Sequence, residues 1–282
     1  MKIGIIGVGL IGASMAVSLK DVIKTAEIIG CDHDQKNCEI ALETGVIDRF
    51  ECLEMVVERA DIIFLTPPVS VIEKMLPRIL SMPNISDKVI IDCGSTKNQI
   101  VNSVKQHAFR GRYVAAHPMA GTEHSGAANA VKGLFIGKNM IICDHENSDK
   151  DALDLAVGFF KALSMNVLYM DSLSHDLHLA YVSHLSHITS FSLAVSVLEK
   201  ERDEKEIFDL AAGGFNSTVR LAASNPATWT PIFLQNRENL IDAIESYTDV
   251  MGRFKEALIN NDGEALTEIM LKCEKIKEII KN

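Results

Sequence analysis

The sequence lacks several features that would assign it to a common class of protein. It contains no run of 18 uninterrupted apolar residues, so we expect no membrane-spanning helix. Basic residues are in the minority, with 28 Lys and Arg against 38 Asp and Glu, and the net charge of −10 argues against nucleic acids and anionic membrane surfaces as partners. None of the six cysteines belongs to a C-x-x-C pair, which predicts reduced, mostly buried thiols in a cytoplasmic protein.

The remaining composition is typical of two globular domains. A chain of 282 residues with 47% hydrophobic residues is too long for one small core. Residues 1–170 alternate short apolar runs with helical patterns, and runs such as "DIIFL" and "VIIDC" are typical of parallel strands buried on both faces. The predicted strands are residues 3–6, 27–31, 61–66, 89–93, 113–116, 139–143 and 166–170. This pattern predicts an α/β fold with an N-terminal Rossmann-type, doubly wound sheet.

Residues 171–282 predict an all-helical C-terminal domain, because strand-like runs stop near residue 171. The expected elements are a long helix over residues 172–201, shorter helices over 206–223 broken at Gly213 and Gly214, a helix from 226 to about 260, a turn at 261–263 and a last helix. Asn225 followed by Pro226 is a typical helix start. No repeat or low-complexity linker separates the domains, and we expect these two domains alone.

Three glycines near the start predict a dinucleotide site. Gly7, Gly9 and Gly12 have the G-x-G-x-x-G spacing between a predicted strand and a helix, which explains this apolar segment better than a secretory signal does. Gly7 makes the tight turn, Gly9 admits a pyrophosphate, and Gly12 lets helix and strand pack closely. The intervening Val8, Leu10 and Ile11 complete the predicted turn.

Asp32 adds specificity to this prediction. It ends the second predicted strand, 20 residues after Gly12, where an acidic residue hydrogen-bonds the adenosine ribose. No Arg follows it to bind a 2′-phosphate, so we expect NAD rather than NADP. The simpler alternative is a glycine-rich turn with an ordinary surface aspartate.

Polar and small residues follow three further predicted strands. Thr66, Pro67 and Pro68 follow one, Ser95 another, and His117 the third, so all can meet at the carboxyl edge of a parallel sheet. A neutral histidine can accept a hydroxyl proton as a hydride leaves, and Ser95 can bond the same hydroxyl or orient the imidazole. The alternatives are a histidine that only stabilises a loop and a serine that only caps a helix.

The second domain supplies further candidates. His184 falls within an apolar stripe of the long helix, formed by Leu177, Tyr181, Ile188, Phe191 and Val195, and His187 lies at its edge. His184 is either a core histidine or a ligand of the substrate, and His187 is the better candidate to reach a polar ligand. His175 and His178 project to the other side of an ideal helix, so we expect no metal site. Arg220, within a short apolar helix, either reaches solvent or binds an anion.

Five stretches together resemble the prephenate dehydrogenases, the TyrA family. They are the glycine motif, "DCGSTK", "HPMAGTEHSG", "SHLSHITSFSLA" and "GGFNSTVRLAASNPATW", and the resemblance extends from residue 3 to about residue 243. It implies that His117 interacts with the substrate's ring hydroxyl, assisted by Ser95. It also implies that His187 lines the substrate site, that a buried Arg220 binds a substrate carboxylate, and that Glu123 lies in a gating loop. Asn216, Ser217 and Val219 depart from the family pattern.

The implied reaction is NAD-dependent oxidative decarboxylation of prephenate to 4-hydroxyphenylpyruvate, in tyrosine biosynthesis. Arogenate dehydrogenase, or a dual-specificity cyclohexadienyl dehydrogenase, is the first alternative. A β-hydroxyacid dehydrogenase is disfavoured because residues 172–191 contain no lysine, and a non-catalytic NAD-sensing regulator is more remote.

We also expect a homodimer formed through the C-terminal domain. Its helical patterns carry more apolar positions than about 110 residues bury alone. Examples are the stripe of the long helix and the side chains of Trp229, Ile232, Phe233 and Leu240.

Overall fold

The computed structural model describes residues 1–280 apart from 123, 204 and 205. Its contacts divide the chain into two compact units, Met1–Asn236 and Arg237–Asn282, which are described separately. The change from strands to helices falls where the sequence predicts it, since the last strand ends at Met170 and a helix begins at Ser172. The first compact unit nevertheless continues past this boundary, because the helices that follow pack on the sheet's own helices.

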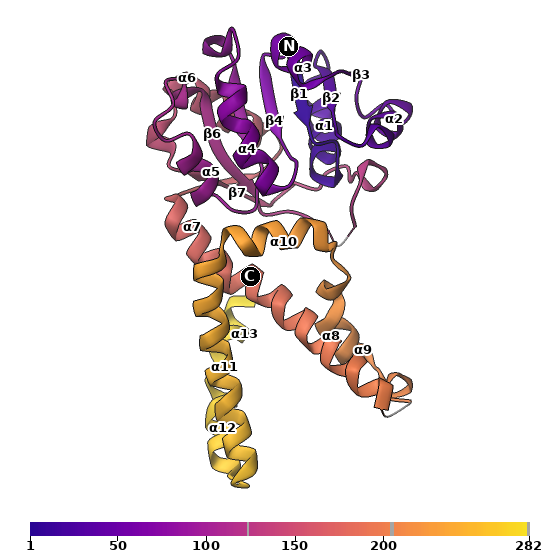
Figure 1. The fold of residues 1–282 in the computed structure, drawn as a ribbon, viewed down its shortest axis with the longest axis vertical. Coiled ribbons are helices and arrows are strands. Elements are labelled where there is room, and N and C mark those ends of the chain that lie inside the picture. Colours follow the sequence, from indigo (N-terminus) through magenta and orange to yellow (C-terminus); the bar gives the residue numbers. More distant parts are fainter. Residues whose placement is uncertain (123, 204–205, 281–282) are drawn as a thin grey trace. The chain divides into compact units, whose positions relative to one another are not determined.

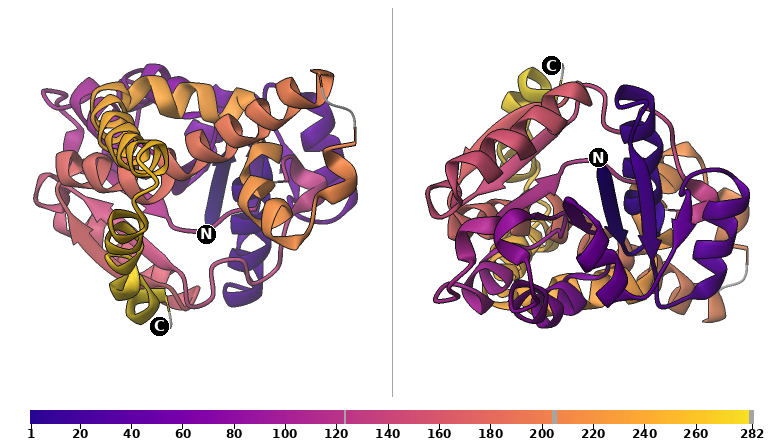
Figure 2. Two further views of the ribbon diagram at one scale, coloured as in Figure 1. Left: turned by 90° about the horizontal axis from the view of Figure 1, so that it is seen from below. Right: turned by 90° about the horizontal axis from the view of Figure 1, so that it is seen from above.

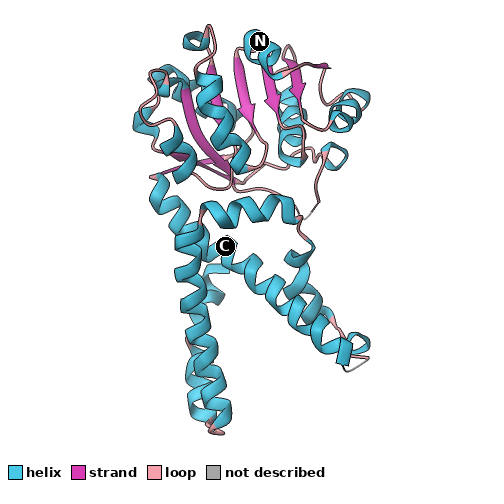
Figure 3. Cartoon of the chain, viewed as in Figure 1, coloured by secondary structure: helices cyan, strands magenta, loops and turns pink. Residues whose placement is uncertain are grey.

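The first unit is built on one eight-stranded sheet with the strand order β3-β2-β1-β4-β5-β6-β7-β8 (Figure 1, Figure 3). The strands are β1 (Lys2–Ile6), β2 (Glu27–Cys31), β3 (Arg49–Phe50), β4 (Ile62–Leu65), β5 (Val89–Asp92), β6 (Tyr113–Pro118), β7 (Asn139–Cys143) and β8 (Asn166–Met170). All seven predicted strands are confirmed, and the fold class with them. The sequence pattern missed only β3, which is two residues long. β7 is antiparallel to β6, and the other pairs are parallel.

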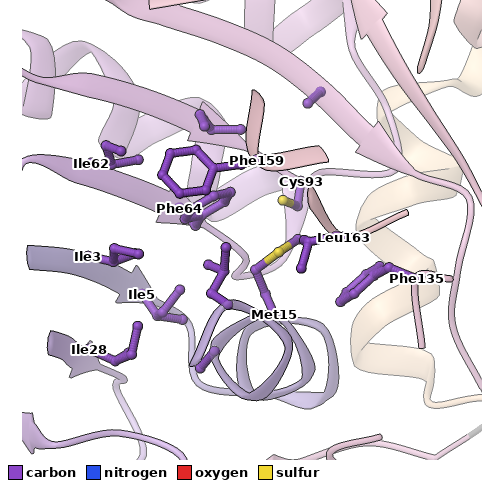
Figure 4. Packing of buried hydrophobic residues seen from close by; sticks show 14 of the residues in the cluster. Ile3, Ile5, Met15, Ile28, Ile62, Phe64, Cys93, Phe135, Phe159 and Leu163 are labelled. Carbon is purple, nitrogen blue, oxygen red and sulfur yellow. The ribbon is translucent and has the colours of Figure 1, made fainter. Parts of the chain in front are cut away.

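Helices cover both faces of this sheet, as the views along it also show (Figure 2). They are α1 (Leu10–Val22), α2 (Gln35–Glu43), α3 (Leu53–Arg59), α4 (Val69–Leu80), α5 (Asn98–Ser103) and α6 (Lys150–Ala162). Alternate residues of one strand enter two different cores: Ile3 and Ile5 pack with Met15 of α1 and Phe159 of α6, whereas Ile6 packs in the opposite core (Figure 4). Burial on both faces explains why the strands read as continuous apolar runs.

The long helix predicted after residue 171 is present but interrupted. It consists of α7 (Ser172–Leu179), a π-helical segment η5 (Ala180–His184) and α8 (Leu185–Asp203). A π-helical turn holds one more residue than an α-helical turn, so it changes which side chains share a face. After α8 come the short helices η6 (Phe208–Leu210), α9 (Gly213–Val219) and η7 (Arg220–Ala223). The glycine pair therefore begins a helix instead of breaking one.

The helix predicted from residue 226 to about 260 is wrong as a single element. It divides into α10 (Pro226–Gln235) and α11 (Arg237–Ile259), and Asn236 between them leaves the helical region. Its amide is buried and donates to the main-chain oxygen of Asp176. The predicted start is confirmed, because Asn225 Oδ1 accepts from the main-chain nitrogen of Ala227.

The second unit contains α11, α12 (Gly263–Leu271) and α13 (Glu274–Ile280). Asp262 caps α12 by accepting a bond from the main-chain nitrogen of Ala265, and Asn261 before it has a φ of 51°, as the predicted turn requires. Within the described residues, no helix is both long and apolar enough to cross a membrane.

Candidate active site

Two adjoining cavities lie at the carboxyl edge of the sheet. The first cavity, of about 310 Å³, is bordered by the glycine turn and by the segments after β4 and β5. The second cavity, of about 320 Å³, is bordered by the end of β6 and by η5, α8 and η7. Both are large enough for small-molecule ligands. The residues that line both cavities are Ser95, Ala120, Gly121, Thr122, Ser224 and Trp229.

The glycine turn has the geometry of a phosphate-binding turn. Gly7 has a φ of +91°, and a Cβ atom there would lie 2.5 Å from the main-chain nitrogen of Pro67. A Cβ atom on Gly12 would lie 2.2 Å from the Gly7 oxygen, so the start of α1 packs directly on the turn. Gly9 lines the first cavity, and a Cβ atom there would meet nothing within 4 Å. This open approach to main-chain N–H groups at a helix start fits a pyrophosphate.

The other predicted cofactor residues divide into two groups. Leu10 and Ile11 line the first cavity, as do Thr66, Pro67 and Pro68, and Thr66 Oγ1 also donates to the Gly7 oxygen at 2.6 Å. Two residues do not line it. The side chain of Val8 is fully buried in the core, and Asp32 stands just beyond β2, where its Oδ1 accepts from the main-chain nitrogen of Asp34 at 2.9 Å.

Ser95 lies where the two cavities meet. It does not cap a helix, because α5 begins at Asn98 with Lys97 as its N-cap residue. Because it lines both cavities, this residue is placed to contact a ligand in either of them.

His117 is the last residue but one of β6 and lines the second cavity. The residue is only 8% exposed, and burial lowers the pKa of its imidazole well below the usual value, with neighbouring His175, Lys97 and His184 adding to the effect. The side chain is therefore neutral at pH 7 and can accept a proton. Its Nδ1 atom lies 2.9 Å from Nε2 of His175.

The sequence analysis missed His175. It is fully buried on α7 and directly contacts His117, with ring centroids 5.1 Å apart. An ideal α-helix puts residues 175 and 184 on opposite sides, because nine residues make two and a half turns of about 3.6 residues. The intervening π-helical segment breaks that regular spacing, and both histidines act on the pKa of His117. The adjacent aspartate in "HD" was a visible signal of a paired histidine.

His184 and His187 both line the second cavity. His184 is 1% exposed, burial lowers its pKa to about 4, and its Nδ1 accepts from Asn236 Nδ2 at 3.0 Å. His187 is half-buried, with a pKa lowered mainly by burial, and its Nδ1 donates to the Ser183 oxygen. Its ring stacks on Trp229 at a centroid distance of 3.4 Å. His184 is therefore buried, as a core histidine would be, and it also lines the cavity, where it could contact a ligand.

Arg220 begins η7 and lines the second cavity. Our expectation of a buried arginine is wrong: the residue is exposed where η7 borders the second cavity. With Arg220 and three histidines, the described part of the lining holds no carboxylate. The cavity is therefore locally basic in a protein whose net charge is −10.

Four residues singled out in the sequence remain. Glu123 falls outside the described residues, so its predicted gating role stays a prediction. Asn216, Ser217 and Val219 belong to α9, which precedes Arg220, and line neither cavity. Within the described part of the chain, no group of three or more His, Cys, Asp or Glu side chains is arranged to hold a metal ion.

The chain is similar to known proteins over nearly its whole length. Residues 15–169 match the family profile "Prephenate dehydrogenase, nucleotide-binding domain", and residues 171–272 match "Prephenate dehydrogenase, dimerization domain". The prephenate dehydrogenase of Lactococcus lactis is 30% identical over 280 residues, which are 98% of this chain and 77% of that protein. The cyclohexadienyl dehydrogenase of Zymomonas mobilis is 26% identical over 99% of this chain and 96% of that protein.

A solved structure extends the similarity to the fold. It is the prephenate dehydrogenase from A. aeolicus in complex with hydroxyphenyl propionate and NAD+, with a TM-score of 0.88 and 31% identity over 100% of this chain and 98% of that chain. Because the first profile spans more than half of the chain and these relatives match nearly all of it, the chain is an oxidoreductase that belongs to the prephenate dehydrogenase family.

Proposed function

We propose that the protein catalyses the NAD-dependent oxidative decarboxylation of prephenate to 4-hydroxyphenylpyruvate. The observation that carries this proposal is the pair of adjoining cavities that meet at Ser95, with the glycine turn in one and His117 in the other. A dehydrogenase needs this arrangement, because the hydride donor carbon and the nicotinamide must be in contact while a base reaches the hydroxyl.

The first cavity supports NAD as the cofactor, which serves as the hydride acceptor when bound. The turn from Gly7 to Gly12 and the first turn of α1 would hold its pyrophosphate. Asp32 at the end of β2 supports a free ribose over a 2′-phosphorylated one, because a carboxylate attracts hydroxyl donors and repels a phosphate.

The second cavity supports a substrate with two carboxylates. Arg220 and the three histidines supply donors, and Trp229 supplies an aromatic wall. Prephenate carries a ring carboxylate and a pyruvyl side chain, whereas the alternative substrate, arogenate, carries an ammonium group in place of the keto group. The described lining offers no carboxylate to pair with an ammonium group, which favours prephenate.

The residues of this site account for the proton transfers in the proposed reaction. Neutral His117 accepts the proton of the ring hydroxyl, and Ser95 bonds the same oxygen and orients it. The hydride leaves the hydroxyl-bearing carbon, and the ring carboxylate departs as carbon dioxide as the ring becomes aromatic. Arg220 holds a carboxylate of the substrate and leaves the reacting carbon near His117.

The assembly we propose is a homodimer formed through the residues that match the dimerization profile. Three members of the predicted stripe on α7, η5 and α8 are exposed in the single chain: Leu177 (43%), Tyr181 (44%) and Val195 (49%). A second copy covering this face removes that apolar surface from water. The second set of apolar side chains on which the dimer was predicted does not support it, because two of its members, Ile232 and Leu240, are already buried in the single chain.

The free thiols of all six cysteines support a cytoplasmic location.

One steady-state experiment tests the proposed function. Purified protein is assayed with prephenate and with arogenate, each with NAD and with NADP, and the formation of reduced cofactor is followed by absorbance. The proposal expects the highest kcat/KM with prephenate and NAD. Higher kcat/KM with arogenate reassigns the substrate, and no turnover with either substrate refutes the function.

A further inference from the structure

A buried chain of polar groups leads from His117 to two residues, His175 and Asp176, that do not line the second cavity. His117 Nδ1 is 2.9 Å from His175 Nε2, and His175 Nδ1 is 2.7 Å from Asp176 Oδ1. The residues are 8%, 0% and 2% exposed, respectively. We call His117, His175 and Asp176 the triad.

The main chain fixes Asp176 in place and determines the direction of the hydrogen bonds. Its Oδ1 accepts from the main-chain nitrogen of Lys97 at 2.8 Å, and its Oδ2 accepts from that of Asn98 at 2.9 Å. A carboxylate can only accept, so the remaining bond at Oδ1 must be donated by His175 Nδ1.

The direction of this bond then sets the tautomer of both histidines. In the tautomer of His175 that carries the proton on Nδ1, Nε2 accepts a bond from Nδ1–H of His117. Neutral His117 therefore has no proton on Nε2, and that atom keeps its lone pair for the ligand of the second cavity.

We propose that His175 and Asp176 are positioning residues that hold His117 in the tautomer and orientation of a general base and stabilise its protonated form. This role rests on the proposed function. In the reaction, the proton of the substrate hydroxyl moves to Nε2 of His117, whose Nδ1–H still donates to His175. The Asp176 carboxylate stabilises the resulting imidazolium through His175.

The other charged groups near His117 make this stabilisation necessary. Lys97 comes from the segment before α5 and His184 from η5, and each lowers the pKa of His117. Arg220 of η7 lines the same cavity as His117. Lys97 is itself bound to Asp92, which also accepts from the hydroxyl of Tyr113. Among the described residues, Asp176 is the carboxylate that is linked to His117 through the imidazole of His175.

The first test is Asp176→Asn, which removes the negative charge and puts one amide N–H where only acceptors fit. We expect kcat with prephenate to fall at least about tenfold, with the KM for prephenate and the affinity for NAD nearly unchanged. The acid limb of the pH profile of kcat/KM should move to lower pH, because the protonated form of His117 loses its stabilising charge. If Asp176→Asn keeps the wild-type kcat and the wild-type pH profile of kcat/KM, the proposal is overturned.

A matched control on the same helix separates this role from helix stability. Asp171 caps α7 through the main-chain nitrogen of Ser174, and its side chain has no hydrogen bond to the triad; its main-chain oxygen, which an alanine keeps, accepts from the main-chain nitrogen of His175. Asp171→Ala should lower the melting temperature but leave kcat and the pH profile unchanged. If it reproduces the kinetic effect of Asp176→Asn, the proposal is wrong.

Two substitutions of His175 keep the proposal testable if Asp176→Asn does not fold. Glutamine retains a carbonyl oxygen that can accept from His117 Nδ1–H, and leucine does not. His175→Gln should therefore keep a higher kcat than His175→Leu, and equal kcat values contradict the role.

A readout without turnover distinguishes failure of the triad from failure of the proposed function. In ¹⁵N NMR spectra of the wild type with labelled histidine, His117→Asn identifies the signals of His117, which should show a protonated Nδ1 and an unprotonated Nε2. A proton on Nε2 refutes the triad even if the enzyme is active. The expected tautomer in a protein that oxidises neither prephenate nor arogenate would refute the function alone.

Discussion

The neutral state of His184 predicts a specific loss of stability in acid. The side chain is 1% exposed, and its Nδ1 atom accepts a hydrogen bond from Asn236 Nδ2, so protonation at Nδ1 both charges a buried group and removes this bond. Burial lowers the pKa of His184 from 6.5 to about 4 in the folded protein. The unfolded chain binds the proton more readily, so stability is fully present above pH 6.5 and falls as the pH drops from 6.5 towards 4.

The magnitude follows from the shift in the pKa. A difference of about 2.5 pH units at about 1.36 kcal/mol per unit gives about 3 kcal/mol of unfolding free energy lost by pH 4. The assay is urea unfolding of the wild type and of His184→Gln at one protein concentration and several pH values. The difference in unfolding free energy between them should shrink by about 3 kcal/mol from pH 7 to pH 4. A difference that stays constant would refute a buried, neutral His184.

The remaining predictions concern the site and the assembly. His117→Asn should lower kcat by about 10²–10⁴-fold while NAD affinity changes little, and near-normal turnover in steady-state assays would make His117 structural. Arg220→Ala should raise the KM for prephenate about tenfold or more, since a hydrogen bond to a charged group contributes about 1.5–3 kcal/mol, and an unchanged KM would exclude contact with the carboxylate. Asp32→Ala should reduce the preference for NAD over NADP in kcat/KM, which an unaltered ratio contradicts. Light scattering at micromolar concentration should give twice the mass of the 31.0 kDa chain, and a monomer with full activity would exclude a functional dimer.

The fold was largely predictable because its sheet is buried on both faces. Continuous apolar runs identified every strand except β3, whose two residues are too few for any pattern. The helical part was less predictable, because the break at Asn236 depends on a contact with the main chain of Asp176, 60 residues earlier in the sequence. A break that depends on so distant a contact has no local sequence signal.

The site was predictable where residues follow strands and uncertain where they lie on helices. Ser95 and His117 reach the cavities because strand ends meet at one edge of the sheet. His175 was assigned to the wrong face because the prediction assumed a regular helix, and the sequence gives no warning of a π-helical segment. Burial of Arg220 was also predicted wrongly, since apolar neighbours in the sequence did not show that it is exposed where η7 borders the second cavity.

The most direct test of the account measures reduced cofactor and carbon dioxide together during turnover of prephenate with NAD. The wild type should form both in equal amounts, together with 4-hydroxyphenylpyruvate, and His117→Asn should lose both rates by the same factor. Reduced cofactor without carbon dioxide, or no reaction in the wild type, would contradict oxidative decarboxylation with His117 as its base.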